Sequence, residues 1–331
     1  MIRTVAQMGT IVTVQVVGHA SDPPEITARE QSVERALAWF QRVEDCCTRF
    51  DPASELRRLT AHIGEAIPVS DLLFEVVQFA LAVAEASGGA FDPTVGASME
   101  RHGFNRHYRT GLVSPTAVEL PGAASYRDVQ LDPARKTIQL FRPLVLDLGA
   151  VAKGLAIDMA ARELRSFEHF AIDAGGDLYL GGSNAAGEPW SVGIRHPRRD
   201  RELIEMVQLS NSAVCTSGDY ERRSSADNPG HHILDPRTGS AVESVASVTV
   251  VAPTAMAADA LATAAFVLGP KDGIHFLEQQ GVSGLILTPT LERFSTGPIW
   301  DDDGKLGARG VQSSAFNVQS SRFVPNPEKV R

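Results

Sequence analysis

The chain has 331 residues, of which 43% are hydrophobic and 21% charged, a balance typical of a folded globular protein. Lys and Arg total 31 against 40 Asp and Glu, and the net charge of −9 argues against nucleic-acid binding as the main task. There is no apolar run long enough for a transmembrane helix, and three cysteines, two of them adjacent, cannot form a disulfide framework.

The first half of the chain predicts one strand and two helices. Residues 10–17 alternate as a strand does, and apolar residues recur at helical spacing over residues 30–50, with Cys47 on the buried face. A second apolar helix is expected over residues 72–86, where Ser-Gly-Gly ends it. Residues 107–135 are rich in turn formers and predict a variable connection.

The second half predicts short strands interspersed with two helices. The helices are expected over residues 150–164 and 255–268, the latter capped by Thr254. The strands are expected over residues 138–141, 144–146, 171–173, 178–180, 190–194 and 248–251. Because no regular βαβ series appears, the pattern favours an α+β fold over a doubly wound sheet.

The N-terminus has no apolar signal segment, no cleavage site and no cysteine that could take a lipid. As the sequence stands, the protein is expected in the cytoplasm. A periplasmic or membrane-anchored location would require that an export signal has been removed.

Asp259 and Thr263 lie four residues apart on the second of these helices, so their oxygens share one face. A carboxylate on so apolar a helix is costly unless it is paired or binds a cation. Oxygen ligands of this kind suit Mg²⁺. A buried salt bridge or a water-exposed helix end would explain the same pattern equally well.

Lys153 lies in the first turns of the helix that follows Asp147, where backbone N–H groups attract anions. It is a candidate phosphate contact, although for either residue taken alone a helix-capping Asp147 and a solvated Lys153 are the favoured interpretation. The glycines at 149 and 154 do not form a P-loop, because the lysine precedes the second glycine. No dinucleotide-binding glycine fingerprint follows any strand.

His231 and His232 precede a short apolar step and a Pro-Arg-Thr-Gly turn. On an extended segment they point to opposite faces, so only one of them can serve a given site as general base. Taken alone, a surface histidine pair is the simpler interpretation. A Ser–His–Asp hydrolase is disfavoured because no G-x-S-x-G motif is present.

Eight segments, in this order, resemble the ApbE-type FAD:protein FMN transferases, and together they cover most of the chain. They are Met8-Gly9-Thr10, Ser54-Glu55-Leu56 with Leu59, residues 89–96, residues 146–154, Asp173-Ala174-Gly175-Gly176-Asp177, residues 216–220, residues 232–239 and residues 254–264.

The resemblance implies an α+β fold with a mixed-sheet core and a smaller flanking α/β region. It implies one domain over residues 1–300, or two subdomains within it, followed by a polar tail over residues 301–331. The implied reaction is a Mg²⁺-dependent transfer of the FMN half of FAD to a threonine or serine hydroxyl of an acceptor protein, with release of AMP. The expected acceptor is a flavoprotein or an electron-transfer protein.

The resemblance also places the site residues. His232 is the expected general base. The expected metal ligands are Asp259, Thr263 and the backbone carbonyl of Ala150. The expected FAD contacts are Met8, Phe50, Ala90, Phe91, Asp92, Asp147, Lys153 and Ile233. Two alternatives keep the same fold: an FAD diphosphatase, in which water is the acceptor, and a non-catalytic FAD-binding protein.

Overall fold

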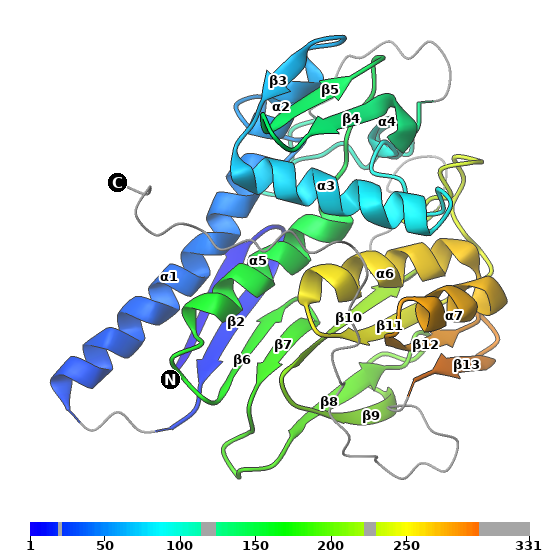
Figure 1. The fold of residues 1–331 in the computed structure, drawn as a ribbon. Coiled ribbons are helices and arrows are strands. Elements are labelled where there is room, and N and C mark those ends of the chain that lie inside the picture. The colour runs from blue at the N-terminus through cyan, green and yellow to red at the C-terminus, as the bar shows by residue number, and fades with distance from the viewer. Residues whose placement is uncertain (19–21, 114–123, 222–229, 298–331) are drawn as a thin grey trace.

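The computed structural model describes residues 1–18, 22–113, 124–221 and 230–297, and an eight-stranded sheet forms its centre (Figure 1). The order across the sheet is β1-β2-β6-β7-β10-β11-β12-β13. These strands are β1 (Ile2–Gln7), β2 (Thr10–Val16), β6 (Phe170–Ala174), β7 (Asp177–Gly181), β10 (Ser212–Gly218), β11 (Ser247–Ala252), β12 (Ser283–Leu287) and β13 (Arg293–Thr296). The expected α+β fold is confirmed.

Every neighbouring pair in this sheet is antiparallel. The sheet itself is therefore not the mixed parallel and antiparallel sheet that the resemblance implied. The reason lies in the connections. Hairpins join β1 to β2 and β6 to β7. Two helices, α6 (Ala255–Leu268) and α7 (Pro270–Gln279), return the chain to the end of β11, where Val251 pairs with Ser283.

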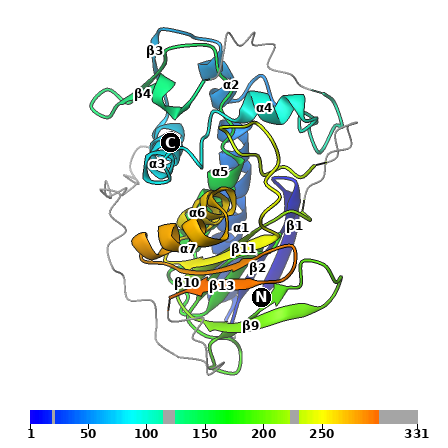
Figure 2. The same ribbon diagram turned by 90° about the vertical axis from the view of Figure 1, so that its right-hand side faces the viewer.

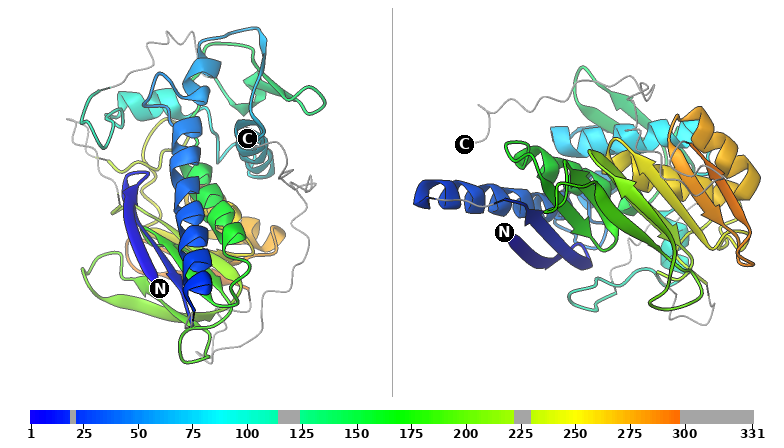
Figure 3. Two further views of the ribbon diagram at one scale, coloured as in Figure 1. Left: turned by 90° about the vertical axis from the view of Figure 1, so that its left-hand side faces the viewer. Right: turned by 90° about the horizontal axis from the view of Figure 1, so that it is seen from below.

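Three long helices cover one face of the sheet (Figures 2 and 3). They are α1 (Pro23–Cys47), α5 (Gly149–Glu163) and α6, and α5 packs against both of the others. The helix α3 (Asp71–Ala86) lies across their upper ends in Figure 1. Phe40, Leu155 and Phe266 are fully buried in the core between these helices and the sheet.

A two-stranded ribbon covers part of the other face of the sheet. Its strands are β8 (Trp190–Arg195) and β9 (Leu203–Leu209). Side chains on β10 alternate between the two faces: Val214 joins the cluster under the ribbon, whereas Ala213 and Cys215 join the core under the helices. The central strands are therefore buried on both faces, which explains their nearly continuous apolar runs.

A smaller region flanks the upper end of the helices. It contains a three-stranded sheet in the order β3-β5-β4, with the short helices α2 (Glu55–Thr60) and α4 (Gly96–Arg101) beside it. The strands are β3 (Ala66–Pro68), β4 (Val129–Asp132) and β5 (Thr137–Leu140), and a 3₁₀ helix spans Tyr126–Asp128. The segment 107–135 was expected to be a variable connection, but its described part contributes a strand and a 3₁₀ helix, while residues 114–123 lie outside the described residues.

The helix ends follow from capping side chains. The Asp22 carboxylate accepts from the N–H of Glu25, so α1 begins at Pro23 and not near residue 30, and it ends at Cys47 instead of reaching residue 50. The Cys47 side chain is buried, as expected. Thr254 caps α6 by accepting from the N–H of Ala257, which confirms the predicted start of that helix.

The strand expected over residues 144–146 is wrong. Only Val145 pairs, in an isolated parallel bridge with Val95. The segment instead docks on the loop before α4: the Gly96 N–H donates to the Val145 carbonyl, and the Asp147 N–H donates to the Pro93 carbonyl.

The predicted tail, residues 301–331, lies outside the described residues. Within the described ranges, no helix is long and apolar enough to cross a membrane.

Candidate active site

The two helices that carry the predicted phosphate and metal residues are fixed against each other at one close crossing. Gly154 of α5 lies directly against the start of α6, where a Cβ would come within 2.5 Å of the Ala255 carbonyl oxygen. One turn later, the Asp158 carboxylate accepts from the N–H groups of Ala255 (2.7 Å) and Met256 (3.0 Å). Burial raises the pKa of Asp158 to about 7, against the opposing effect of these two hydrogen bonds.

Lys153 lies between two carboxylates beside this crossing. Its ammonium contacts Asp177 Oδ2 at the start of β7 and lies 3.6 Å from Asp259 Oδ2 on α6. The side chains of Asp177 and Asp259 are 4% and 10% exposed. Two nearly buried carboxylates therefore share one ammonium, and the cluster carries a net negative charge.

Hydroxyl groups of β10 complete this cluster. Ser217 Oγ lies 3.2 Å from Thr263 Oγ1, the second predicted metal ligand. The N–H of Thr216 donates to Asp177 Oδ1 at 3.2 Å. The two side chains expected to bind a metal are thus neighbours of a lysine, a second carboxylate and a serine from three further elements.

The chemistry of these groups fits a hard divalent cation. Apart from Lys153, no described residue donates a hydrogen bond to the buried Oδ2 atoms of Asp177 and Asp259. Oxygen atoms of carboxylate, hydroxyl and carbonyl groups are the ligands that Mg²⁺ prefers. Within the described ranges, no cluster of three or more His, Cys, Asp or Glu could hold a metal by itself. A cation here would also need oxygens of the Thr263 and Ala150 type.

The start of α5 is organised by Asp147 and by Arg49, a residue that the sequence did not single out. Asp147 Oδ1 accepts from the N–H of Gly149 at 2.8 Å, and Arg49 Nε donates to Asp147 Oδ2 at 2.6 Å. The Arg49 guanidinium also lies 4.3 Å from the ring centre of Phe50 and donates to the Phe104 carbonyl. Arg49 is 4% exposed, so this arrangement is part of the folded scaffold.

Ala90, Phe91 and Asp92 form a buried loop next to this point. Asp92 accepts from the N–H and hydroxyl of Thr94 (2.9 and 2.8 Å) and from the N–H of Tyr126 (3.0 Å). Burial raises the pKa of Asp92, and the Thr94 bonds oppose that shift. The loop continues into Pro93, whose carbonyl accepts a hydrogen bond from the N–H of Asp147. The two predicted FAD-binding segments therefore lie side by side.

The two histidines face different surroundings. His231 Nδ1 accepts from the N–H of Ile233 (3.2 Å), so Nε2 carries the proton that is donated to the Val242 carbonyl (2.7 Å). Both nitrogens of the His231 ring therefore serve the local fold. The ring of His232 instead lies 6.4 Å from that of Phe104, the residue that also contacts Arg49. His232 is thus the member of the pair that lies beside Phe104 and Arg49, whereas the His231 ring packs at 5.6 Å against that of Phe266 on α6.

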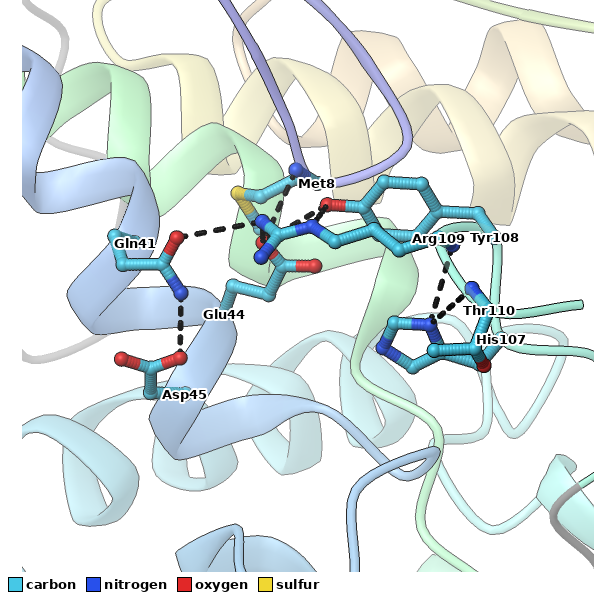
Figure 4. A network of polar contacts seen from close by, with 8 residues as sticks. All are labelled: Met8, Gln41, Glu44, Asp45, His107, Tyr108, Arg109 and Thr110. Atoms are coloured by element: carbon cyan, nitrogen blue, oxygen red, sulfur yellow. Dashed lines mark hydrogen bonds and ion pairs between the residues drawn. The ribbon is translucent and has the colours of Figure 1, made fainter. Parts of the chain in front are cut away.

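Met8 belongs to a polar network that ties the first hairpin to α1 (Figure 4). The carboxylate oxygen Oε2 of Glu44 accepts from the Met8 N–H (3.3 Å), the Tyr108 hydroxyl (3.1 Å) and Arg109 Nη2 (2.6 Å). The Tyr108 ring stacks on His107, whose ring meets Phe50 edge-on at 6.4 Å. Met8 and Phe50 are therefore linked through His107 and Tyr108, which belong to the segment expected to be a variable connection.

The predicted positions thus gather around the start of α5. Contacts through Arg49, Phe104 and Pro93 join Asp147 to Phe50, His232 and the loop that contains Asp92. Ile233 is buried next to His232, and Ala150 precedes Lys153 by one turn. Their roles toward FAD or metal stay predictions. The residues missed were Arg49, Glu44 and Asp158, and Asp177 and Ser217 were noticed only as parts of motifs.

A model of the ApbE family matches residues 8–286. Several proteins named FAD:protein FMN transferase are similar in sequence, among them one from Vibrio cholerae and one from Treponema pallidum. The one from Vibrio cholerae is 31% identical over 295 residues, with 87% of each chain covered. The one from Treponema pallidum is 34% identical over 304 residues, with 85% of this chain and 83% of the relative covered.

Solved structures agree with this relationship. The ApbE protein of Thermotoga maritima has a TM-score of 0.76 and 32% identity, and the match covers 88% of this chain and 96% of that one. The flavin transferase ApbE from Vibrio cholerae has a TM-score of 0.75 and 26% identity, covering 90% and 97%. Because the family model spans most of the chain and relatives above 30% identity cover most of it, the chain belongs to the ApbE family and is an enzyme of that family, as the order of its motifs predicted.

Proposed function

We propose that this protein is an FAD:protein FMN transferase that uses Mg²⁺ and modifies a threonine or serine of an acceptor protein. The observation that carries the proposal is the cluster of Lys153, Asp177, Asp259 and Thr263 beside the start of α5. A diphosphate needs positive charge and hydrogen-bond donors. Beside the start of α5, this acidic chain places a lysine together with two carboxylates that could bind a divalent cation. The names of its relatives support the same activity.

Asp259, Thr263 and the Ala150 carbonyl would hold the metal, which when bound neutralises charge on the diphosphate. Lys153 supplies a further positive charge from the neighbouring helix. Phe50 and Phe91 offer rings for the flavin or the adenine. The close crossing at Gly154 keeps α5 and α6 in register, so the diphosphate contacts stay at a fixed spacing from the metal ligands.

His232 is the proposed general base. It takes the proton from the acceptor hydroxyl as the hydroxyl oxygen forms a bond to the phosphorus of the FMN half. The bond from that phosphorus to the bridging oxygen breaks, and AMP leaves with the bridging oxygen. Because Nδ1 of His232 is a buried atom, we propose that Nε2 is the nitrogen that takes the proton from the acceptor hydroxyl.

Release of AMP tests the proposal. The protein is incubated with FAD and Mg²⁺, with and without an unmodified flavin-carrying electron-transfer protein as acceptor. We expect AMP release that depends on the acceptor and is lost in Asp259→Asn. Equal AMP release without acceptor would support the FAD diphosphatase alternative instead. FAD binding with no AMP release under either condition would support a non-catalytic FAD-binding protein.

A further inference from the structure

Lys153 is shared unequally between its two carboxylates. Its ammonium contacts Asp177, whereas 3.6 Å separates it from Asp259. One ammonium can neutralise only one carboxylate fully. The arrangement therefore leaves Asp259 as the less compensated of two nearly buried acids, and this is the acid to which the proposed function assigns the metal.

In the ion pair between Asp177 and Lys153, Asp177 is the more rigid partner. It begins β7, directly after the tight turn at Gly175-Gly176, where both glycines have positive φ. A side chain at Gly175 would collide with Thr10 Oγ1 at 2.1 Å, so the turn is closely packed on the first hairpin. The Thr216 N–H holds the other carboxylate oxygen at 3.2 Å. By contrast, Lys153 has a long side chain that is 21% exposed.

We propose that Asp177 is a positioning residue that holds the Lys153 ammonium away from Asp259 and so keeps Asp259 available for a divalent cation. This inference rests on the proposed function, because it takes Asp259 as the metal-binding carboxylate. Without the negative charge of Asp177, the ammonium gains most by moving the short distance to Asp259. It then competes with the cation for the same carboxylate.

The inference predicts a specific pattern of metal affinities. Asp177→Asn keeps the shape of the side chain and an oxygen for the Thr216 N–H, but it no longer attracts the ammonium. Metal binding should weaken on the order of tenfold, within the range measured for coupled neighbouring charges. Lys153→Gln removes the competitor, so metal binding should strengthen. In the double variant, Asp177→Asn should have little further effect, because no ammonium remains to be released.

The experiment measures Mn²⁺ binding by electron paramagnetic resonance on the full chain without FAD, so no catalytic activity is needed. The four proteins are the unchanged chain, the two single variants and the double variant, with thermal unfolding as the check on folding. The supporting result is a large effect of Asp177→Asn that disappears in the Lys153→Gln background. If Asp177→Asn weakens binding equally in both backgrounds, Asp177 acts on the cation directly and the inference is overturned.

Two comparisons keep the outcomes separate. If Asp259→Asn binds Mn²⁺ as tightly as the unchanged chain, Asp259 is not the metal-binding carboxylate, and both the proposed site and this inference are wrong. If Asp259→Asn loses binding while Lys153→Gln fails to strengthen it, the proposed site survives and the inference alone fails. If Asp177→Asn does not fold, failure of Lys153→Gln to strengthen binding still overturns the inference.

Discussion

Gly154→Ala tests whether the close crossing of α5 and α6 sets the geometry of the site. The new Cβ would lie 2.5 Å from both the Ala255 carbonyl oxygen and the Met256 Cα, and the first turn of α6 must retreat by about 0.9 Å to reach an ordinary 3.4 Å contact. That movement also stretches the hydrogen bonds that Asp158 accepts from Ala255 and Met256, now 2.7 and 3.0 Å.

The magnitude follows from two opposing effects. Overpacking against backbone costs up to about 3 kcal/mol. Alanine in place of glycine within a helix returns about 1 kcal/mol. A net loss of about 2 kcal/mol corresponds to a fall in melting temperature of roughly 3 °C for a domain of about 300 residues, from an unfolding entropy of about 2.1 cal/mol/K per residue. A displacement near 1 Å between Lys153 and Asp259 should slow AMP release roughly a hundredfold.

Thermal unfolding and AMP release, measured on the same samples, provide the assay. Gly230→Ala is the matched control for unfolding, since its Cβ would lie 3.5 Å from the Ala241 side chain, an ordinary contact. If Gly154→Ala melts like the unchanged chain and releases AMP at the same rate, the crossing does not hold the metal-binding helix in place, and the reasoning is refuted.

Four further predictions concern single side chains. Asp259→Ala should abolish FMN transfer and keep the fold, and wild-type-like transfer at limiting Mg²⁺ would exclude Asp259 as a ligand. Lys153→Ala should weaken FAD binding by roughly 1.5–3 kcal/mol in a flavin-fluorescence titration, whereas an unchanged dissociation constant would exclude a phosphate contact. His232→Asn should slow AMP release roughly a hundred- to ten-thousand-fold with FAD binding retained. His231→Asn should mainly lower stability, and if it is instead the variant with slow AMP release, His231 is the general base. Because burial raises the pKa of Asp158 to about 7, the contribution of Asp158 to folding stability should fall as pH rises from about 4 to about 7. The free energy of unfolding of Asp158→Asn should therefore lack this decrease relative to the unchanged chain, and identical pH dependence of the two proteins would contradict the shift.

The sequence predicted well where a local rule decides the structure. Thr254 caps α6 as its hydroxyl chemistry predicts, and the helical spacing that includes Cys47 placed that side chain in the core. The run at residues 144–146 misled because apolar residues in a strand and in a buried extended segment look alike. Only the tertiary contact of Val145 with Val95 and Gly96 distinguishes the two, and no local pattern contains it.

In the candidate site, too, local pairs could be predicted from the sequence and long-range contacts could not. Asp259 and Thr263 share a helix face, so periodicity alone could pair them. Asp177 lies more than eighty residues before Asp259 in the chain, and it reaches Lys153 only because β7 is packed beneath α5 and α6. Arg49 was equally out of reach, since its partner Asp147 is 98 positions away. Long-range ion pairs of this kind are set by the topology of the sheet and helices, which short sequence patterns do not specify.

The acceptor itself gives the most direct test of the central claim. The unmodified acceptor protein is incubated with FAD, Mg²⁺ and this protein, and intact and peptide mass spectrometry are combined with quantification of AMP. The account predicts an acceptor that carries one FMN on a threonine or serine through a phosphoester, with one AMP released for each acceptor modified. Free FMN and AMP in equal amounts beside an unmodified acceptor would contradict it.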